Sequence, residues 1–151
     1  MKPSKFPLSG ACRCGQVTVE VTAPPVMTAA CHCTGCQSMS SSAYSLTATF
    51  PVDALSVTQG APVVGGLKGP DLSHYFCPEC MTWMFTRITG LDAFVNVRPT
   101  LFDDRNWFSP FIETMTDEKL AWAETPAPHG FAGFPSMEEF IGLMEAFAEV
   151  E

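Results

Sequence analysis

The stretch Ala30-Cys31-His32-Cys33-Thr34-Gly35-Cys36-Gln37 places three thiols and an imidazole within six residues. We expect the rest of the chain to be a scaffold for it. Thiolates bind Zn²⁺ at about 2.3 Å, usually as a tetrahedral set, so three cysteines in one tight turn supply three corners of a site. A zinc with three protein ligands and one open position is typical of catalytic sites. The stretch therefore predicts a catalytic zinc held by Cys31, Cys33 and Cys36.

The other four of the seven cysteines form two pairs at chelating spacings, Cys12-Arg13-Cys14 and Cys77-Pro78-Glu79-Cys80. An odd number of cysteines at such spacings in a reducing compartment indicates metal or redox chemistry rather than a disulfide framework. A closed set of four thiolates is the structural kind of zinc site, and we favour it over a set of free thiols. We therefore predict a structural zinc, in addition to the catalytic one, on Cys12, Cys14, Cys77 and Cys80.

Composition favours one packed domain over residues 1–151, because 46% of the residues are hydrophobic and only 16% are charged. The formal charge of −8, with only 8 Lys and Arg, argues against a nucleic-acid partner. The first residues lack the apolar run of a signal peptide, and nowhere do 18 apolar residues follow one another. We expect a soluble, cytoplasmic protein without a membrane span.

Alternating and apolar runs predict many short strands, at residues 16–21, 26–30, 44–50, 55–59, 73–76, 83–86 and 93–97, with a further hairpin from 113–115 and 120–123. A Gly/Pro-rich surface loop is expected at residues 60–70. Gly15 is expected to allow a sharp turn after Cys14.

The period of the apolar residues changes from two to 3.6 at the end of the chain. Ser136 and Glu139 have the spacing of a capping box, and a stripe at i, i+3, i+4 and i+7 follows, formed by Phe140, Leu143, Met144 and Phe147. We predict an amphipathic helix over about 136–149. The fold class is therefore mainly β and antiparallel, with metal-pinned turns and a C-terminal helix.

Three motifs occur in a characteristic order: Gly10-Ala11-Cys12-Arg13-Cys14-Gly15, Cys31-His32-Cys33-Thr34-Gly35-Cys36 and Phe76-Cys77-Pro78-Glu79-Cys80. Together they resemble the glutathione-dependent formaldehyde-activating enzyme family, which also includes centromere protein V. The similarity spans roughly residues 9–123, because Leu101-Phe102-Asp103-Asp104, Pro110 and Trp122 are similar to later motifs of that family.

The resemblance implies a β-tent-like fold of antiparallel sheets. It also implies a structural and a catalytic zinc on the two cysteine sets named above. The implied activity is that of a carbon–sulfur lyase, which reversibly adds glutathione to formaldehyde to give S-hydroxymethylglutathione. The implied partners are a small thiol such as glutathione and a small carbonyl compound.

The chain departs from the family pattern at two positions. Met81 stands where a glycine usually follows the second cysteine pair, and we expect this change to alter only the turn. Gln37 stands where a basic residue usually follows the third active cysteine. That change removes a positive charge near the site, which weighs against the dianionic glutathione tripeptide.

Two alternatives to a catalytic zinc remain open at the triple-cysteine stretch. The site could be closed by His32, His74 or an acidic side chain, and would then belong to a non-catalytic zinc-stabilised binding module. Alternatively, Cys33 and Cys36 could form the redox pair of a thiol oxidoreductase, which we rank lowest.

Other polar and aromatic residues are expected to have supporting roles. We expect a supporting or packing role for His32, since successive side chains tend to face opposite ways, and a bystander role for His74 and His129. Asp103 and Asp104 are expected to form a turn. Four aromatic side chains are expected to line the core or a pocket, namely Phe85, Trp107, Phe108 and Trp122.

Overall fold

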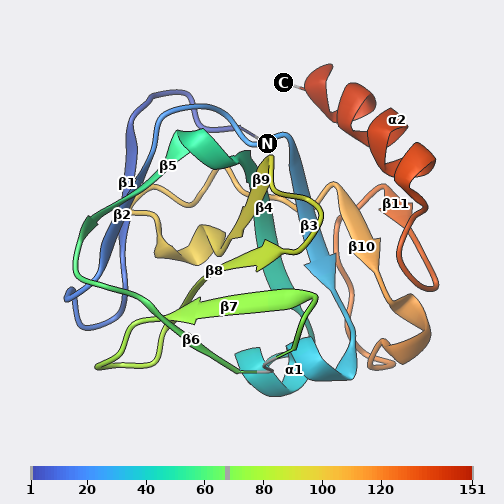
Figure 1. Cartoon of the computed structure of the whole chain (residues 1–151). Coiled ribbons are helices and arrows are strands. Elements are labelled where there is room, and N and C mark those ends of the chain that lie inside the picture. The colour runs from blue at the N-terminus through green and yellow to red at the C-terminus, as the bar shows by residue number, and fades with distance from the viewer. Residues whose placement is uncertain (1, 67–68, 151) are drawn as a thin grey trace.

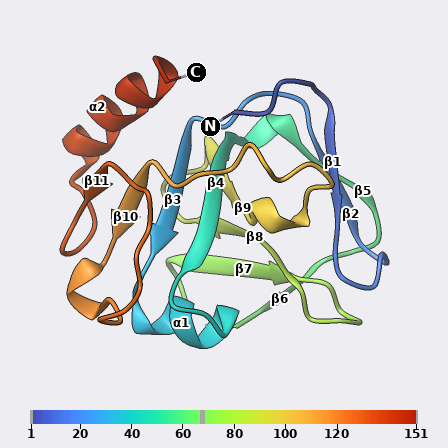
Figure 2. The same ribbon diagram turned by 180° about the vertical axis from the view of Figure 1, so that it is seen from behind.

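Two β-sheets form the body of the chain, which a computed structural model describes over residues 2–66 and 69–150 (Figure 1). The smaller sheet contains β1 (Leu8–Ala11), β2 (Thr18–Val21) and β5 (Leu55–Gln59), paired antiparallel in the order β1-β2-β5. Figure 2 shows this sheet at the side of the molecule opposite the C-terminal helix. Its inner face carries Val19 and Val21, which are fully buried, as the alternation of valines predicts.

The larger sheet has the strand order β11-β10-β3-β4-β9-β8-β7-β6. Its strands are β3 (Met27–Cys31), β4 (Ser45–Pro51), β6 (Val63–Gly65), β7 (Leu72–Phe76), β8 (Trp83–Ile88), β9 (Phe94–Val97), β10 (Ile112–Thr114) and β11 (His129–Gly130). Most neighbours are antiparallel, but β10 pairs parallel with both β3 and β11. The parallel register sets Thr114 opposite Cys31, where the triple-cysteine stretch begins.

The predicted fold class is confirmed, with two corrections at the level of single elements. The expected hairpin of 113–115 with 120–123 is wrong, because β10 pairs with β3 and β11 and residues 120–123 form no strand. The apolar residues there do not mark a buried face: Trp122, expected in the core or a pocket, is 74% exposed. The expected loop at 60–70 contains β6, while its residues 67 and 68 lie outside the described residues.

Two hydrophobic cores hold the elements together. The first fills the space between the sheets and includes Phe50, Val97 and Phe102. The second lies beneath α2 (Met137–Ala148), whose Leu143 and Phe147 pack against residues of β3, β10 and the segment before β10. The predicted helix is confirmed, including the capping box between Ser136 and Glu139.

The triple-cysteine stretch continues from β3 into the short helix α1 (Thr34–Ser40). Cys33 is the N-cap residue, and its sulfur accepts a hydrogen bond of 3.3 Å from the backbone N–H of Cys36. Three 3₁₀ turns complete the secondary structure, η1 (Val52–Ala54), η2 (Pro99–Leu101) and η3 (Thr116–Glu118). Within the described residues, neither α1 nor α2 is long and apolar enough to cross a membrane.

Candidate metal centres

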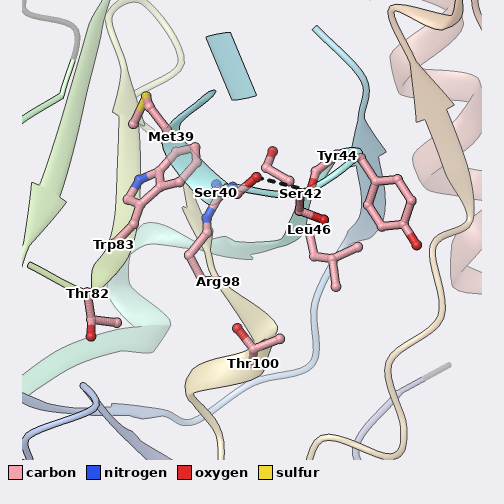
Figure 3. Close-up of a pocket in the computed structure, with 10 residues that line it drawn as sticks. Met39, Ser40, Ser42, Tyr44, Leu46, Thr82, Trp83, Arg98 and Thr100 are labelled. Carbon is pink, nitrogen blue, oxygen red and sulfur yellow. Dashed lines mark hydrogen bonds between the residues drawn. The ribbon is translucent and has the colours of Figure 1, made fainter. Parts of the chain in front are cut away.

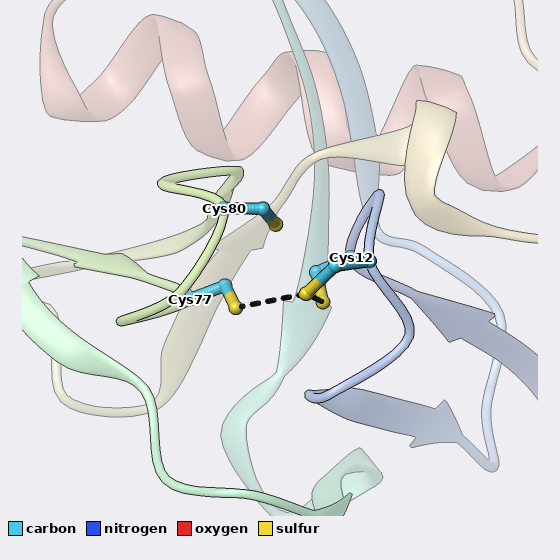
Figure 4. Close-up of side chains that lie close together, drawn as sticks. Cys12, Cys77 and Cys80 are labelled. Atoms are coloured by element: carbon cyan, nitrogen blue, oxygen red, sulfur yellow. Dashed lines mark hydrogen bonds between the residues drawn. The ribbon is translucent and has the colours of Figure 1, made fainter.

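The four-cysteine cluster joins two turns that lie far apart in the sequence. Cys12 and Cys14 follow β1, and Gly15 turns the chain into β2 with a φ of +77°, as expected. Cys77 and Cys80 form the turn between β7 and β8. Figure 4 shows the sulfurs of Cys12, Cys77 and Cys80 pointing toward a common point between these turns.

The sulfur separations in this cluster fit a tetrahedral thiolate site. The Sγ of Cys14 lies 3.6 Å from that of Cys12 and 3.7 Å from that of Cys77. Four sulfurs at about 2.3 Å from a shared zinc would be about 3.8 Å apart, whereas a disulfide would bring two of them to about 2.05 Å. All four ligand atoms lie within 4.8 Å of one another, so the cluster could hold a metal ion.

The three-cysteine cluster is local, because its sulfurs come from the end of β3 and the first turn of α1. The Sγ atoms of Cys31, Cys33 and Cys36 also lie within 4.8 Å of one another and could hold a metal ion. Hydrogen bonds from the Cys36 side chain and the Cys33 backbone lower the pKa of the Cys31 thiol. Within residues 2–66 and 69–150, no histidine, aspartate or glutamate joins this set of three ligand atoms.

His32 is fully buried and is not among the clustered ligand atoms, in agreement with the expected supporting role. Its Nε2 lies 3.0 Å from Oε2 of Glu113, and its ring packs edge-on against Tyr44 at a centroid distance of 5.3 Å. Glu113 also accepts hydrogen bonds from Lys119 at 3.1 Å and from Thr125 at 2.8 Å. Burial opposes ionisation of Glu113, but these hydrogen bonds outweigh it and lower the pKa of the carboxyl.

Gln37 anchors α1 rather than facing a ligand. Its side-chain amide donates to the carbonyl oxygen of His32 at 2.6 Å and to that of Glu118 at 3.0 Å. The neutral Gln37 side chain thus makes two hydrogen bonds, one to His32 between β3 and α1 and one that holds the helix to η3.

Figure 3 shows a cavity of about 350 Å³ whose lining includes residues next to the three-cysteine cluster but none of the three cysteines. Ser40 from α1 and Ser45 from β4 lie on the side of the cysteines, and Ser45 stands opposite Cys31 in the β3–β4 register. The other lining residues are Met39, Ser42, Tyr44, Leu46, Thr82, Trp83, Arg98 and Thr100. The pocket thus combines an apolar wall with hydroxyl groups and one guanidinium.

The remaining predicted residues join neither cysteine cluster. His74 is buried and hydrogen-bonded through Nδ1 to the Thr86 hydroxyl at 2.9 Å, so it is part of the packing. His129 packs edge-on against Phe111. Asp104 forms the expected turn, in which its side chain accepts from the backbone N–H of Asn106 at 3.2 Å.

Sequence reasoning missed Glu113 and Arg98. The short run that contains Glu113 was expected to be one arm of a hairpin, so its carboxylate had no reason to point at His32. Arg98 follows directly after the apolar strand β9 and precedes Pro99, and a charge at a strand end reads as solvent-exposed. The only sequence signal that Arg98 could be buried was its position between an apolar strand and a proline.

Three comparisons with known proteins agree on the family or the fold. Residues 7–118 match the profile of the family described as glutathione-dependent formaldehyde-activating enzyme. A Penicillium rubens protein, provisionally named glutathione-dependent formaldehyde-activating enzyme, is 34% identical over 120 residues. The match covers 71% of this chain and 61% of that relative, which is less than two thirds of the relative's length.

A crystal structure of a Rhodobacter sphaeroides protein has a similar fold, with a TM-score of 0.55 at 21% identity. The match covers 65% of this chain and 90% of the other. The profile match extends over both cysteine clusters and over more than half of the chain. The chain therefore belongs to the glutathione-dependent formaldehyde-activating enzyme family.

Proposed function

We propose that the chain is a zinc-dependent enzyme of the carbon–sulfur lyase type, acting on the adduct of a thiol such as glutathione with formaldehyde or another small carbonyl. One observation carries the proposal: three cysteine sulfurs converge with no fourth protein ligand among the described residues, and Cys31 pairs with Ser45, which lines a cavity of about 350 Å³. A cytoplasmic location, where thiols stay reduced, is part of this proposal.

The donor sets fit zinc, because clustered thiolates at these separations are the ligands that soft and borderline metals prefer. Cys12, Cys14, Cys77 and Cys80 would hold a structural ion, and Cys31, Cys33 and Cys36 a second ion. When bound at the second site, zinc would supply Lewis-acid polarisation of a carbonyl oxygen or stabilisation of a substrate thiolate.

The surrounding residues would bind and orient the substrate. The Ser40 hydroxyl donates to the carbonyl oxygens of Cys36 at 2.6 Å and Tyr44 at 3.2 Å. These hydrogen bonds hold the cavity wall beside the cluster in place. The Ser45 hydroxyl is buried next to the Cys36 side chain and makes no hydrogen bond of good geometry within the described residues. Because it lines the pocket, it would be the group that donates to a carbonyl or hydroxymethyl oxygen there.

The reaction balances without an oxidant. In the forward direction the sulfur of the thiol forms a bond to the carbonyl carbon, the C=O π bond breaks, and the thiol proton ends on the new hydroxyl oxygen. The reverse step breaks the carbon–sulfur bond and returns the proton to sulfur. The protein cysteines act as ligands throughout and form no bond to the substrate.

The test combines zinc analysis with exchange spectroscopy. We expect about two zinc ions per chain, and faster exchange between ¹³C-formaldehyde and its glutathione adduct in the presence of the protein. Cys33→Ser should abolish the acceleration and release one zinc, whereas Ser38→Ala, an exposed change in the same helix, should affect neither. Calorimetry in buffers of differing ionisation enthalpy should show that thiol binding releases a proton.

Two results would contradict the proposal. Binding of neither glutathione nor any smaller thiol by the zinc-loaded protein would favour a non-catalytic binding module. Equal exchange rates for the wild type and Cys33→Ser would show that the three-cysteine cluster takes no part in the reaction.

A further inference from the structure

Arg98 is a buried cation at the pocket wall, placed between β9 and η2. Only 8% of the residue is exposed, and it is the one charged side chain among the described residues that line the pocket. Burial lowers the pKa of its guanidinium to about 10, with the neighbouring Cys36 and Cys31 acting in the opposite direction. The side chain is therefore positively charged at neutral pH.

The guanidinium is held firmly on one face. Its central carbon lies 4.1 Å from the centroid of the Trp83 ring, a cation–π contact. Trp83 is itself held in place, since its indole N–H donates to the Thr86 hydroxyl at 3.1 Å and its ring meets His74 edge-on at 5.1 Å. The orientation of the Arg98 plane is thus fixed from behind.

Most hydrogen-bonding capacity of Arg98 is unused. A guanidinium offers five N–H donors in a planar fork. Within residues 2–66 and 69–150, the Arg98 side chain makes one long hydrogen bond of 3.5 Å to the carbonyl oxygen of Asn96, has no salt bridge, and has no partner for Nε. Figure 3 shows the guanidinium pointing into the pocket, toward the end of α1 that carries Ser40. A buried charge without a partner is costly, so such an arrangement favours an anionic ligand.

We propose that Arg98 binds a carboxylate of the substrate, so that the pocket selects thiols that carry an acid group a few bonds from the sulfur over neutral thiols of the same size. This inference rests on the proposed function, because it places the substrate sulfur at the three-cysteine cluster. Planar, two-pronged pairing is the geometry in which a guanidinium recognises a carboxylate best. Arg98 thereby supplies, from β9, the positive charge that Gln37 does not supply from α1.

The alternative role for Arg98 is charge balance, since three thiolates and one Zn²⁺ carry a net charge of −1 and Arg98 lies near two of the cysteines. A counterion would be needed for metal retention but would not distinguish between thiols. Zinc content and thiol selectivity therefore separate the two roles.

The experiment compares 3-mercaptopropionate with 3-mercaptopropan-1-ol by calorimetric titration into the zinc-loaded protein. We expect the wild type to bind the acid at least about tenfold more tightly, the contribution of one charge-assisted hydrogen bond. Arg98→Met should bring the ratio close to one while the affinity for the neutral thiol stays within about threefold, and Arg98→Lys should keep part of the preference. Arg87→Met is the matched control, because Arg87 is an exposed arginine on β8, and it should leave the ratio unchanged.

The wild type alone can overturn the inference, whether or not Arg98→Met folds. Equal binding of the two thiols by the wild type would exclude a carboxylate site and leave the proposed function standing. Loss of one zinc from a folded Arg98→Met, with the preference for the acid unchanged in the remaining loaded fraction, would assign Arg98 to charge balance. Binding of neither thiol would overturn the proposed function, and with it this inference.

Discussion

The two cysteine clusters differ in what they connect. In the four-cysteine cluster the sulfurs of Cys14 and Cys77, 63 residues apart in the chain, lie 3.7 Å from each other, so a metal there joins the smaller sheet to the β7–β8 turn. In the three-cysteine cluster all sulfurs come from residues 31–36. A metal clip that closes a long loop removes more entropy from the unfolded chain than one that closes a short loop. This difference favours the prediction that the first cluster serves folding and the second serves chemistry.

The largest expected effect separates the two clusters directly. Cys77→Ser should lose one zinc and leave the protein largely unfolded, because structural zinc contributes on the order of 10 kcal/mol while a domain is stable by about 5–15 kcal/mol. Cys33→Ser should also lose one zinc but should unfold at nearly the wild-type denaturant concentration. Zinc analysis with chemical denaturation checks both variants. Equal unfolding of the two would remove the distinction between the clusters.

A smaller effect tests a region that belongs to neither cluster. Leu143→Asp should lower the free energy of unfolding by at least about 3 kcal/mol, because a carboxylate would be buried in the second core or α2 would undock. The zinc content of the folded fraction should stay at the wild-type value. Ile141→Asp on the same helix is the control, and its 53% exposed side chain predicts little change. Similar denaturation midpoints for the two variants would show that α2 does not pack through Leu143.

Local patterns predicted the parts of the fold that local chemistry determines. The valine alternation in β2, the capping box of α2 and its apolar stripe each depend on neighbours within a few residues, and all three are confirmed. The pairing of β10 with β3 could not be predicted in the same way. It joins Ile112 to Ala29 across more than 80 positions of sequence, and three residues carry too little periodicity to choose a partner.

The candidate site divides along the same line. Cysteine spacing alone predicted that the Cys12–Cys14 pair and the Cys77–Cys80 pair form one cluster. The structure brings the sulfurs of this cluster together, and also those of the three-cysteine cluster. The pocket wall was not predictable, because Trp83 and Arg98 meet only through the pairing of β8 with β9. Zinc at these clusters and the roles of their residues stay predictions that the measurements above test.

A moderate effect concerns the support behind the three-cysteine cluster. Glu113→Gln should lower the free energy of unfolding by about 1.5–3 kcal/mol, the value of hydrogen bonds to a charged group, since Glu113 holds His32 and Lys119. Because the folded pKa of this carboxyl is lowered, its contribution is complete above the unfolded value of about 4.3 and is lost as the pH falls through the folded value.

The contribution of the Glu113 carboxyl to the stability difference between the wild type and Glu113→Gln should therefore be constant from pH 6 to 8. It should shrink only in acid. Urea denaturation at several pH values measures it, with the exposed Glu124→Gln as the control. A difference that varies across neutral pH would mean that a group other than the Glu113 carboxyl controls the interaction.

The smallest effect returns to the turn of the four-cysteine cluster, at the position where the family usually has glycine. Met81 has a φ of +56°, and its backbone N–H donates to the carbonyl oxygen of Cys77 at 3.0 Å. The left-handed conformation costs an L-residue roughly 1–2 kcal/mol, whereas glycine adopts it freely but loses more entropy on folding. Met81→Gly should therefore stabilise the zinc-loaded protein by about 0.5–1 kcal/mol.

The control is Glu79→Gly in the same turn, which should act in the opposite direction. Glu79 is not among the residues with positive φ, so a glycine there relieves no strain and only increases the entropy of the unfolded chain. Opposite signs in thermal unfolding at fixed zinc would show that the backbone at Met81 is strained, whereas destabilisation by both changes would show that it is not.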